Sequence, residues 1–359
     1  MKKILLLIFL MFPISIFAIE TSARSAILMD MDSNKILYEK NINEQRSVAS
    51  ISKIMTAVVA IESGKLDDKV TIGREINTAY GSGIYIKEGE VLTLRDLLYG
   101  LMLRSGNDAA MAIATYVGGN STNFVKLMND KAKKIGMNNT VFNNPSGLDQ
   151  EKGNYSTAHD MAILASYAMK NNEYKKITST KKYVLKTNKN VYSWINKNKL
   201  LSLYKYTTGG KTGFTEIAKR TLVSTASRDN MNLVVVTLND GNDWQDHQNL
   251  FEYGFNNYTN LKILNKGIIN IYNEKYYESY NLAIKNDYSY LLNNLDKGNL
   301  VLRYELEKVR KFSVGDCVGK VNVYFNDKKI HTEKIYIDSI KEKSKGVKNK
   351  FIEWIKSLW

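Results

Sequence analysis

Cysteine and histidine are scarce in this chain, and the scarcity of each excludes a kind of site. Because Cys317 is the single cysteine, no disulfide can form within the chain, and we expect this side chain to be buried as a small apolar group. The three histidines, His159, His247 and His331, lie far apart and in no metal-ligand spacing. The sequence therefore predicts neither a metal site nor a cofactor, and the histidines are expected on the polar surface or in satisfied hydrogen bonds.

The chain also lacks nucleic-acid-binding motifs, internal repeats and low-complexity linkers, and its N-terminal apolar run is too short for a comfortable membrane span. That run, Ile4–Phe12, follows two lysines and precedes a proline and, at position 18, an alanine. This succession of a basic, an apolar and a small-residue region is typical of a secretory signal peptide. We therefore expect residues 1–18 to direct export and to be cleaved after Ala18.

Acidic residues are outnumbered, 36 against 51 lysines and arginines, which gives a formal net charge of +15. For an exported protein this excess indicates an anionic neighbourhood, such as a lipid surface or wall polymers, rather than nucleic acid. The segment 344–359 adds an apolar helical face surrounded by lysines, which predicts peripheral association with an anionic membrane, on its outer face. Docking of this helix on the protein's own surface is the alternative. The apolar residues are Val347, Phe351, Trp354, Ile355, Leu358 and Trp359.

The apolar pattern predicts an α+β fold. With 359 residues, 44% of them hydrophobic, the chain can bury a substantial core, and usual domain sizes suggest roughly two domains. Helical patterns lie between strand patterns at both ends of the first domain. Thr93 and Asp96 match a capping box, and Gly136 is a natural helix terminator. The expected strands lie within 25–40 and 220–240, and the expected helices within 50–62, 93–117, 123–136 and 157–170.

Past about residue 262, helical periodicity fades and short alternating apolar runs take its place, which is typical of β-structure. The alternating residues flank a turn at positions 326 and 327 and are Val321, Val323, Phe325, Ile330, Ile335 and Ile337. We therefore expect a first domain over 20–260, a small β-domain over 262–342 and an amphipathic helix over 344–359.

Ser50 and Lys53 have the spacing of a nucleophile and its base. Three residues apart on a helix, they share a face with Cβ atoms about 5–6 Å apart. Burial of this helix favours the neutral amine of Lys53, which can take the serine proton, and the Ser50 N–H lies where a developing oxyanion is stabilised. An ordinary helix start is the alternative. Two further Ser-x-x-Lys matches, at 179–182 and 202–205, make the motif weak by itself.

Two later triplets favour the catalytic interpretation. Ser105-Gly106-Asn107 follows an apolar helical run, and Lys211-Thr212-Gly213 directly precedes the β-rich segment. Taken singly, the first is more often a helix cap and the second a solvated surface charge. Their order and spacing after Ser50 are what distinguish this serine from Ser47 and Ser52.

In these residues the chain resembles the serine penicillin-binding proteins of the low-molecular-mass D-alanyl-D-alanine carboxypeptidase type, over nearly its whole length. The specific matches include "YIKEGEVLTLRDLLYGLMLRSGNDAAMAIA", "NNPSGLD" and "GGKTGFTEIAKRTLVSTASRD". Val48 replaces the usual proline and Ser146 a common histidine, at positions without chemistry. The resemblance implies a penicillin-binding/β-lactamase-like transpeptidase domain, an antiparallel sheet with a helical cluster, followed by the β-domain.

The resemblance also implies a reaction. Ser50 is expected to attack the carbonyl of the penultimate D-alanine of a peptidoglycan stem peptide, with Lys53 as general base. Ser105 is expected to bridge Lys53 to the departing amine, and the Asn107 amide to hold the substrate backbone. D-alanine leaves as the acyl-enzyme forms, and water then hydrolyses the acyl-enzyme. β-Lactam antibiotics are expected to acylate the same serine, and no cofactor is implied.

An exposed strand that carries Lys211, Thr212 and Gly213 is expected to bind the substrate. The resemblance assigns the terminal carboxylate to Lys211 and Thr212, an ammonium and a hydroxyl. Gly213, without a side chain, lets the substrate run close to the strand. The N–H of Phe214, together with that of the nucleophile, is expected to form the oxyanion hole.

Two other functions stay open. A serine β-lactamase shares all three motifs, but its class A form needs a glutamate-activated water, and no Glu-x-x-Leu-Asn segment lies between Asn107 and Lys211. A catalytically silent penicillin-binding or wall-anchoring module would keep the motifs without turnover. Asp149, His159 and Arg220 lie in family-like stretches, but their chemistry suggests no role.

Overall fold

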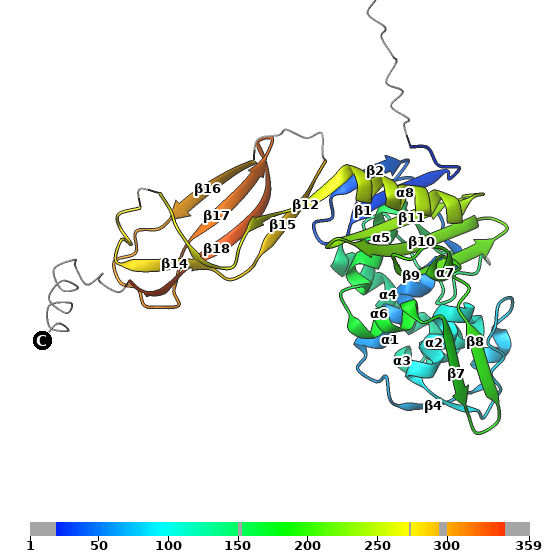
Figure 1. The fold of residues 1–359 in the computed structure, drawn as a ribbon. Coiled ribbons are helices and arrows are strands. Elements are labelled where there is room, and N and C mark those ends of the chain that lie inside the picture. Colours follow the sequence, from blue (N-terminus) through cyan, green and yellow to red (C-terminus); the bar gives the residue numbers. More distant parts are fainter. Residues whose placement is uncertain (1–18, 150–152, 273, 294–299, 342–359) are drawn as a thin grey trace, which may run out of the picture. The chain divides into compact units, whose positions relative to one another are not determined.

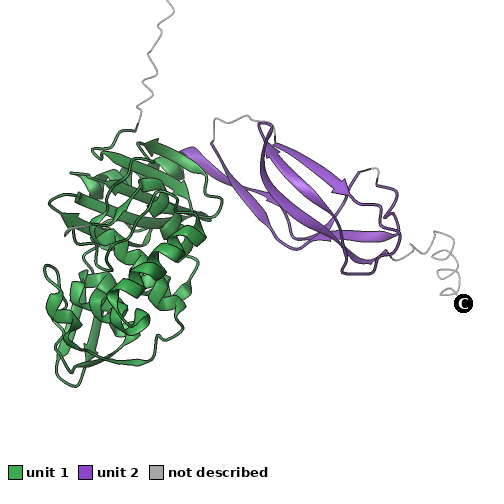
Figure 2. Ribbon diagram, turned by 180° about the vertical axis from the view of Figure 1, so that it is seen from behind, with its two compact units in different colours: residues 1–256 green, residues 257–359 purple. Residues whose placement is uncertain are grey.

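The computed structural model describes residues 19–149, 153–272, 274–293 and 300–341. The chain divides into two compact units, residues 1–256 and 257–359, each of which is described by itself (Figure 2). The expected signal peptide at 1–18 and the expected amphipathic helix at 344–359 lie outside the described residues. Within the described ranges, no helix is long and apolar enough to cross a membrane.

A five-stranded antiparallel sheet organises the first unit (Figure 1). Helix α5 packs on one face of the sheet, and α8 packs on the other, where a Cβ at Gly254 would meet Leu28 and Leu233. Because both faces are covered, strands such as β1 are buried throughout instead of alternating between buried and exposed residues. The elements, in sheet order, are β2 (Ile36–Lys40), β1 (Ser25–Asp30), β11 (Met231–Leu238), β10 (Lys219–Arg228) and β9 (Thr207–Thr215), with α5 (Ala158–Ala168) and α8 (Asp243–Asn257).

A helical cluster lies around α1, in which every residue except Glu62 is buried. The expected capping box is present, since Thr93 Oγ1 accepts from the Asp96 N–H at 3.1 Å and Asp96 Oδ2 from the Thr93 N–H at 2.9 Å. The elements are η1 (Ala49–Ser52), α1 (Lys53–Glu62), η2 (Arg74–Thr78), α2 (Leu94–Arg104), α3 (Asn107–Gly118), α4 (Ser121–Ile135), α6 (Asn172–Ser179) and α7 (Leu200–Leu203).

The segment 93–117, expected as one helical block, forms two helices. Ser105 adopts the left-handed conformation, with φ 63°, and ends α2, while Gly106 is the extended cap that begins α3. Three two-stranded ladders complete the unit, of which the β7–β8 hairpin had no signal in the apolar pattern. They are β3 (Arg46–Ser47) with β6 (Tyr155–Ser156), β4 (Lys69–Thr71) with β5 (Val91–Thr93), and β7 (Lys182–Lys186) with β8 (Val191–Ile195).

The second unit is all β in its described part. Its alternating valines and isoleucines face the core, and the turn residues Asn326 and Asp327 have φ of 48° and 62°, as a tight hairpin requires. The five-stranded sheet has the order β13 (Gly267–Ile269), β14 (Tyr280–Ile284), β18 (Lys328–Ile340), β17 (Cys317–Phe325) and β16 (Leu300–Leu306), and β12 (Tyr258–Leu264) pairs with β15 (Tyr288–Asn293). The predicted fold class, α+β with a small β-domain, is confirmed.

The expectation of a buried cysteine was wrong. Cys317 is exposed, because it begins β17 and the next residue, Val318, is the one that turns into the core. His247, in contrast, is buried with both ring nitrogens in hydrogen bonds, to the Ser224 hydroxyl at 2.5 Å and the Thr237 hydroxyl at 3.0 Å. Burial lowers the pKa of His247 to about 3, so the ring is neutral.

Candidate active site

Ser50 and Lys53 meet where η1 passes into α1. Lys53 Nζ lies 3.0 Å from Ser50 Oγ and 2.7 Å from Asn107 Oδ1, and it also contacts the Ser146 carbonyl oxygen. A neutral amine has two hydrogens for the two carbonyl oxygens, which leaves its lone pair for the serine hydroxyl. The arrangement therefore fits a base directed at Ser50.

The surroundings of Lys53 favour that neutral amine. Its side chain is 0% exposed. Burial, and then the positive charges of Lys211 and Lys197, hold the pKa of Lys53 well below its usual value, with the carboxylate of Asp108 opposing them. A lysine in this condition can act as a general base.

The backbone directly before the nucleophile has a strained conformation, and Gly147 and Ser52 contact it. Ala49, directly before Ser50, has φ 48°, a conformation that non-glycine residues rarely adopt outside functional sites. Gly147 lies so close that a Cβ there would come within 2.1 Å of the Ala49 carbonyl oxygen. Ser52 donates its hydroxyl to the same oxygen at 2.8 Å and is buried, so its hydroxyl faces away from the reaction.

Ser105 and Asn107 approach Ser50 from the break between α2 and α3. Ser105 lines the same cleft as Ser50, but no hydrogen bond joins it to Lys53 among the residues that the structure describes. The relay role of Ser105 therefore stays a prediction. Asn107 is fixed by its amide nitrogen, which donates to the Tyr80 carbonyl at 2.6 Å, and so turns its oxygen to Lys53.

Strand β9 forms the opposite wall of the cleft and is an edge of the main sheet. Thr212, Gly213 and Phe214 line the cleft, while Lys211 is 1% exposed and donates to the Thr212 carbonyl at 2.7 Å. Burial, with the neighbouring charge of Lys197, lowers the pKa of Lys211 to about 7. An unpaired strand edge beside a serine can align an extended peptide with it.

Close packing requires a glycine at position 213, a reason that the sequence did not reveal. A Cβ at this position would lie 2.4 Å from Thr221 Oγ1 and 3.0 Å from the backbone nitrogen of Ser50. Glycine therefore lets β9 pack directly against η1. Passage of the substrate close to this glycine stays a prediction.

Several cleft residues were not singled out from the sequence. Lys197 Nζ donates to Ser82 Oγ at 3.1 Å, and both line the cleft of about 290 Å³. Arg220, for which sequence suggested no role, lines it too and is paired with Asp243. Lys197 lies in a lysine-rich run without a motif, so position in the fold alone distinguishes it.

Asp149 and His159, the other residues without a role, differ from each other. Asp149 accepts from Ser47 Oγ at 2.7 Å and from the Thr215 hydroxyl, and so ties the segment before Ser50 to the end of β9. His159 lines no part of the cleft in the described structure.

The structure shows no candidate metal site in its described residues. No group of three or more His, Cys, Asp or Glu side chains there is placed to hold a metal ion.

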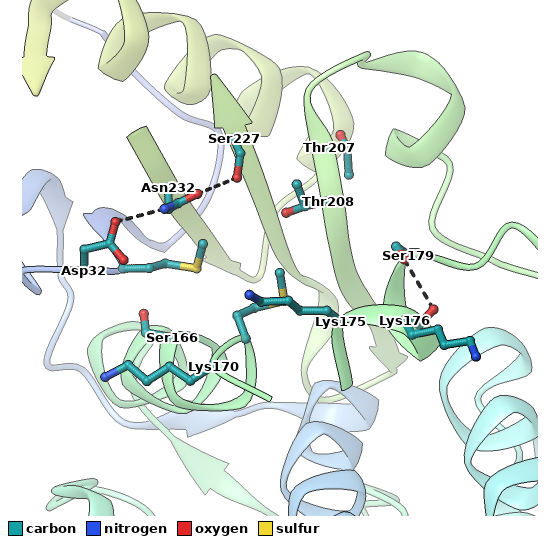
Figure 3. A pocket seen from close by; sticks show the side chains of 12 residues that line it. Asp32, Ser166, Lys170, Lys175, Lys176, Ser179, Thr207, Thr208, Ser227 and Asn232 are labelled. Carbon is teal, nitrogen blue, oxygen red and sulfur yellow. Dashed lines mark hydrogen bonds between the residues drawn. The ribbon is translucent and has the colours of Figure 1, made fainter. Parts of the chain in front are cut away.

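A larger cavity, of about 730 Å³, lies at the other end of β9 (Figure 3). Its serines already donate within the protein, Ser166 to the Ala162 carbonyl and Ser179 to the Lys176 carbonyl. The cavity offers lysines and hydroxyls but no serine with a buried base beside it. The smaller cleft at Ser50 is therefore the candidate site, despite its size.

A serine beside a buried lysine, at the start of a helix packed near an antiparallel sheet, defines an active-serine enzyme of the penicillin-binding class. Comparison with known proteins agrees. Residues 14–242 match the family model described as D-alanyl-D-alanine carboxypeptidase, and residues 258–343 match that of the penicillin-binding protein 5 C-terminal domain. The chain belongs to the D-alanyl-D-alanine carboxypeptidase family.

Individual relatives support the assignment. The D-alanyl-D-alanine carboxypeptidase DacF of Bacillus subtilis is 40% identical over 220 residues, 60% of this chain and 56% of that protein. This match thus spans little more than half of the relative. DacA of Haemophilus influenzae is 30% identical over 358 residues, 94% of this chain and 89% of that protein. The solved penicillin binding protein 5 of Haemophilus influenzae is 29% identical, with a TM-score of 0.74, covering 90% of this chain and 98% of that one.

Proposed function

We propose that the chain is a serine-type D-alanyl-D-alanine carboxypeptidase that removes the terminal D-alanine of peptidoglycan stem pentapeptides through an acyl-enzyme on Ser50. The observation that carries the proposal is the 3.0 Å contact between Ser50 Oγ and the fully buried Lys53 Nζ. Family membership supplies the substrate class.

The residues have distinct tasks in the first half-reaction. Lys53 takes the proton of Ser50 as Oγ bonds to the carbonyl carbon of the penultimate D-alanine. The N–H groups of Ser50 and Phe214 stabilise the oxyanion. The C–N bond then breaks, and the proton passes from Lys53 through Ser105 to the departing amine of D-alanine.

The second half-reaction repeats the sequence with water. Lys53 takes a proton from water as the water oxygen attacks the acyl carbon, and it returns this proton to Ser50 Oγ as the ester bond breaks. Substrate binding precedes both half-reactions. Lys211 and Thr212 then bind the terminal carboxylate of the intact substrate, supported by the cationic Lys197 nearby. The Asn107 amide holds the acyl part of the substrate while it keeps Lys53 in place.

The alternatives predict different products. A β-lactamase would hydrolyse penicillin rapidly, whereas a carboxypeptidase retains it as a long-lived adduct at Ser50. A silent module would release no D-alanine. The match to a penicillin-binding protein 5 C-terminal domain favours the carboxypeptidase.

The test is D-alanine release from a pentapeptide ending in D-Ala-D-Ala, by the wild type and by Ser50→Ala, with labelled penicillin in parallel. Release by the wild type alone, with a stable adduct, is expected. No release by the wild type refutes the activity, and release unaffected by Ser50→Ala refutes the site assignment.

The proposal extends to location. The signal-peptide pattern at 1–18 and the basic amphipathic pattern at 344–359 support export and peripheral attachment to the outer face of the cytoplasmic membrane. Removal of residues 344–359 is expected to abolish binding to anionic vesicles and to leave D-alanine release intact. Unchanged vesicle binding would refute the anchor.

A further inference from the structure

The cavity of about 730 Å³ at the start of β9 is separate from the catalytic cleft (Figure 3). We call it the β9 cavity. Its walls come from the β1–β2 turn, the end of α5, α6 and the adjacent ends of β9, β10 and β11. Strand β9 contributes Thr207 and Thr208 to this cavity, and the described structure shares no lining residue between the cavity and the cleft. The volume lies within the range of binding sites for small organic molecules, and no step of the proposed reaction uses the cavity.

Lysines supply most of the charge of the β9 cavity. Lys170 directly follows α5, and Lys175 and Lys176 lie on α6. All three are exposed, and among the described residues no ion pair or hydrogen bond engages their ammonium groups. In Figure 3 the ammonium group of Lys175 points toward the same side as that of Lys170, whereas that of Lys176 points away. Asp32 is the single acidic residue of the described lining and accepts from the Asn232 amide at 2.9 Å. The excess of positive charge therefore favours an anion.

Hydroxyl groups form much of the remaining polar lining, and the protein already holds them in place. Ser166 donates to the Ala162 carbonyl at 2.8 Å, and Ser227 donates to Asn232 Oδ1 at 2.7 Å. A serine hydroxyl that donates in this way keeps lone pairs that can accept from an O–H group of a ligand. These oxygens are therefore preorganised acceptors, which suits a sugar or another polyol.

Two methionines add an apolar surface to the cavity. Met31 is 6% and Met169 8% exposed, and both belong to the lining. A flexible thioether side chain adapts to an irregular ligand and can cover the C–H face of a sugar ring. An inorganic anion would use neither this surface nor the volume. The cavity therefore fits an organic anion of about the size of a disaccharide.

We propose that the β9 cavity binds a sugar that carries an anionic group, either a phosphate or a carboxylate. The anion lies at Lys170 and Lys175, and the sugar hydroxyls donate to Ser166 and Ser227. The net charge of +15 already indicated an anionic neighbourhood such as wall polymers, and the β9 cavity gives this attraction a specific place. The inference does not depend on the activity proposed for Ser50, because the cavity lies outside the cleft.

The test measures binding to the purified full-length chain by isothermal titration calorimetry. The probes are trehalose 6-phosphate, which is a disaccharide phosphate, lactobionate, which is a disaccharide carboxylate, neutral trehalose and inorganic phosphate. At least one of the two anionic disaccharides is expected to bind roughly tenfold more tightly than trehalose and than inorganic phosphate, because charged hydrogen bonds and sugar contacts then act together. The comparison of trehalose 6-phosphate with lactobionate shows which anionic group the cavity prefers.

Variants assign the binding to the cavity. Lys170→Met and Lys175→Met each remove one ammonium group and are expected to weaken binding of the preferred anionic disaccharide by roughly three- to tenfold. Ser166→Ala is expected to weaken it too and to leave the weaker binding of inorganic phosphate unchanged. Two controls are expected to keep the wild-type affinity. Lys126→Met changes an exposed lysine on α4 outside the cavity lining, and Lys197→Met removes a cation of the cleft.

The proposal is overturned if neither anionic disaccharide binds, or if trehalose or inorganic phosphate binds as tightly as the better of the two. An affinity that Lys197→Met reduces and both cavity lysine variants retain also overturns it, because the anion then lies in the cleft. Thermal unfolding checks that each variant is folded. Failure of the wild type to release D-alanine refutes the function proposed for Ser50 and leaves the binding result at the β9 cavity unaffected.

Discussion

The two units differ in how many of their residues adopt backbone conformations that their residue types disfavour. In the described part of the second unit, the non-glycine residues with positive φ are Asn326 and Asp327, at a hairpin tip that requires them. In the first unit, Ala49, Tyr85, Ser105 and Lys219 also have positive φ, although their residue types do not favour it. Two of these four lie at the cleft, since Ala49 directly precedes Ser50 and Ser105 lines the cleft itself.

Buried lysines separate the units in the same way. Lys53 and Lys211 are 0% and 1% exposed in the first unit, whereas no lysine is buried among the described residues of the second. The described part of the second unit therefore agrees with its sequence in alternation and in core, with Cys317 as the exception. The first departs from such agreement where the chemistry lies, which is where proteins generally do so.

The largest expected effect comes from removing the buried base. Lys53→Met keeps the length and the apolar stem of the side chain but cannot take a proton, so acylation by labelled penicillin should slow by about 10²- to 10⁴-fold. The control Lys334→Met, at an exposed position of β18, should acylate at the wild-type rate. Acylation rates measured by stopped-flow check both, and a fast Lys53→Met enzyme would contradict the assigned base.

A second pair of variants compares crowded glycines in the two units. Gly213→Ala should lower the acylation rate by roughly 10²- to 10³-fold, because its Cβ would crowd the Ser50 nitrogen of the expected oxyanion hole. Gly319→Ala meets the Glu305 carbonyl oxygen at 2.3 Å, so it should destabilise the second unit and leave acylation unchanged. Equal acylation rates for the two variants would contradict the distinction between a glycine beside the expected oxyanion hole and a glycine remote from the chemistry.

The dependence on pH tests the two buried lysines against each other. Lys53 acts as the neutral amine, so kcat/KM should rise with pH as Lys53 loses its proton. Lys211 binds the carboxylate as the ammonium. Because Lys211 loses its proton above a pH of about 7, kcat/KM should fall there by up to tenfold per pH unit. A substrate with a terminal amide should lack the alkaline fall. Lys197→Met removes a charge that lowers the pKa of Lys211, so the fall should move to higher pH. An alkaline limb unaffected by both changes would refute the assignment of Lys211.

The smallest expected effect on chemistry comes from damage to the second core. Ile335 is 0% exposed, and Ile335→Ala should lower the stability of the second unit by about 2–5 kcal/mol. Hydrogen exchange in residues 317–340 should accelerate while penicillin acylation stays within about twofold of the wild type. A large loss of acylation would show that the units depend on each other.

The sequence predicted the fold class because apolar periods of two and of about four residues carry it, as in β17 and α4. The order of three motifs pointed to Ser50, Ser105 and Thr212, which line one cleft in the structure, while the catalytic roles of these residues stay predictions. The apolar pattern continues through Ser105 and so gave no sign of the break there, which agrees with the alternative interpretation of Ser105-Gly106-Asn107 as a helix cap. Nor could the sequence identify Lys197 or Ser82, because these residues reach the cleft by tertiary packing rather than by a local pattern.

The open edge of β9 also bears on the behaviour of the protein at high concentration. An edge that accepts an extended peptide accepts a strand from another chain by the same hydrogen bonds, and it is a recognised route to aggregation. Phe214, 58% exposed on this strand, makes such pairing more favourable. Occupancy of the cleft by a substrate-like peptide would therefore protect the protein from self-association as well as compete with its substrate.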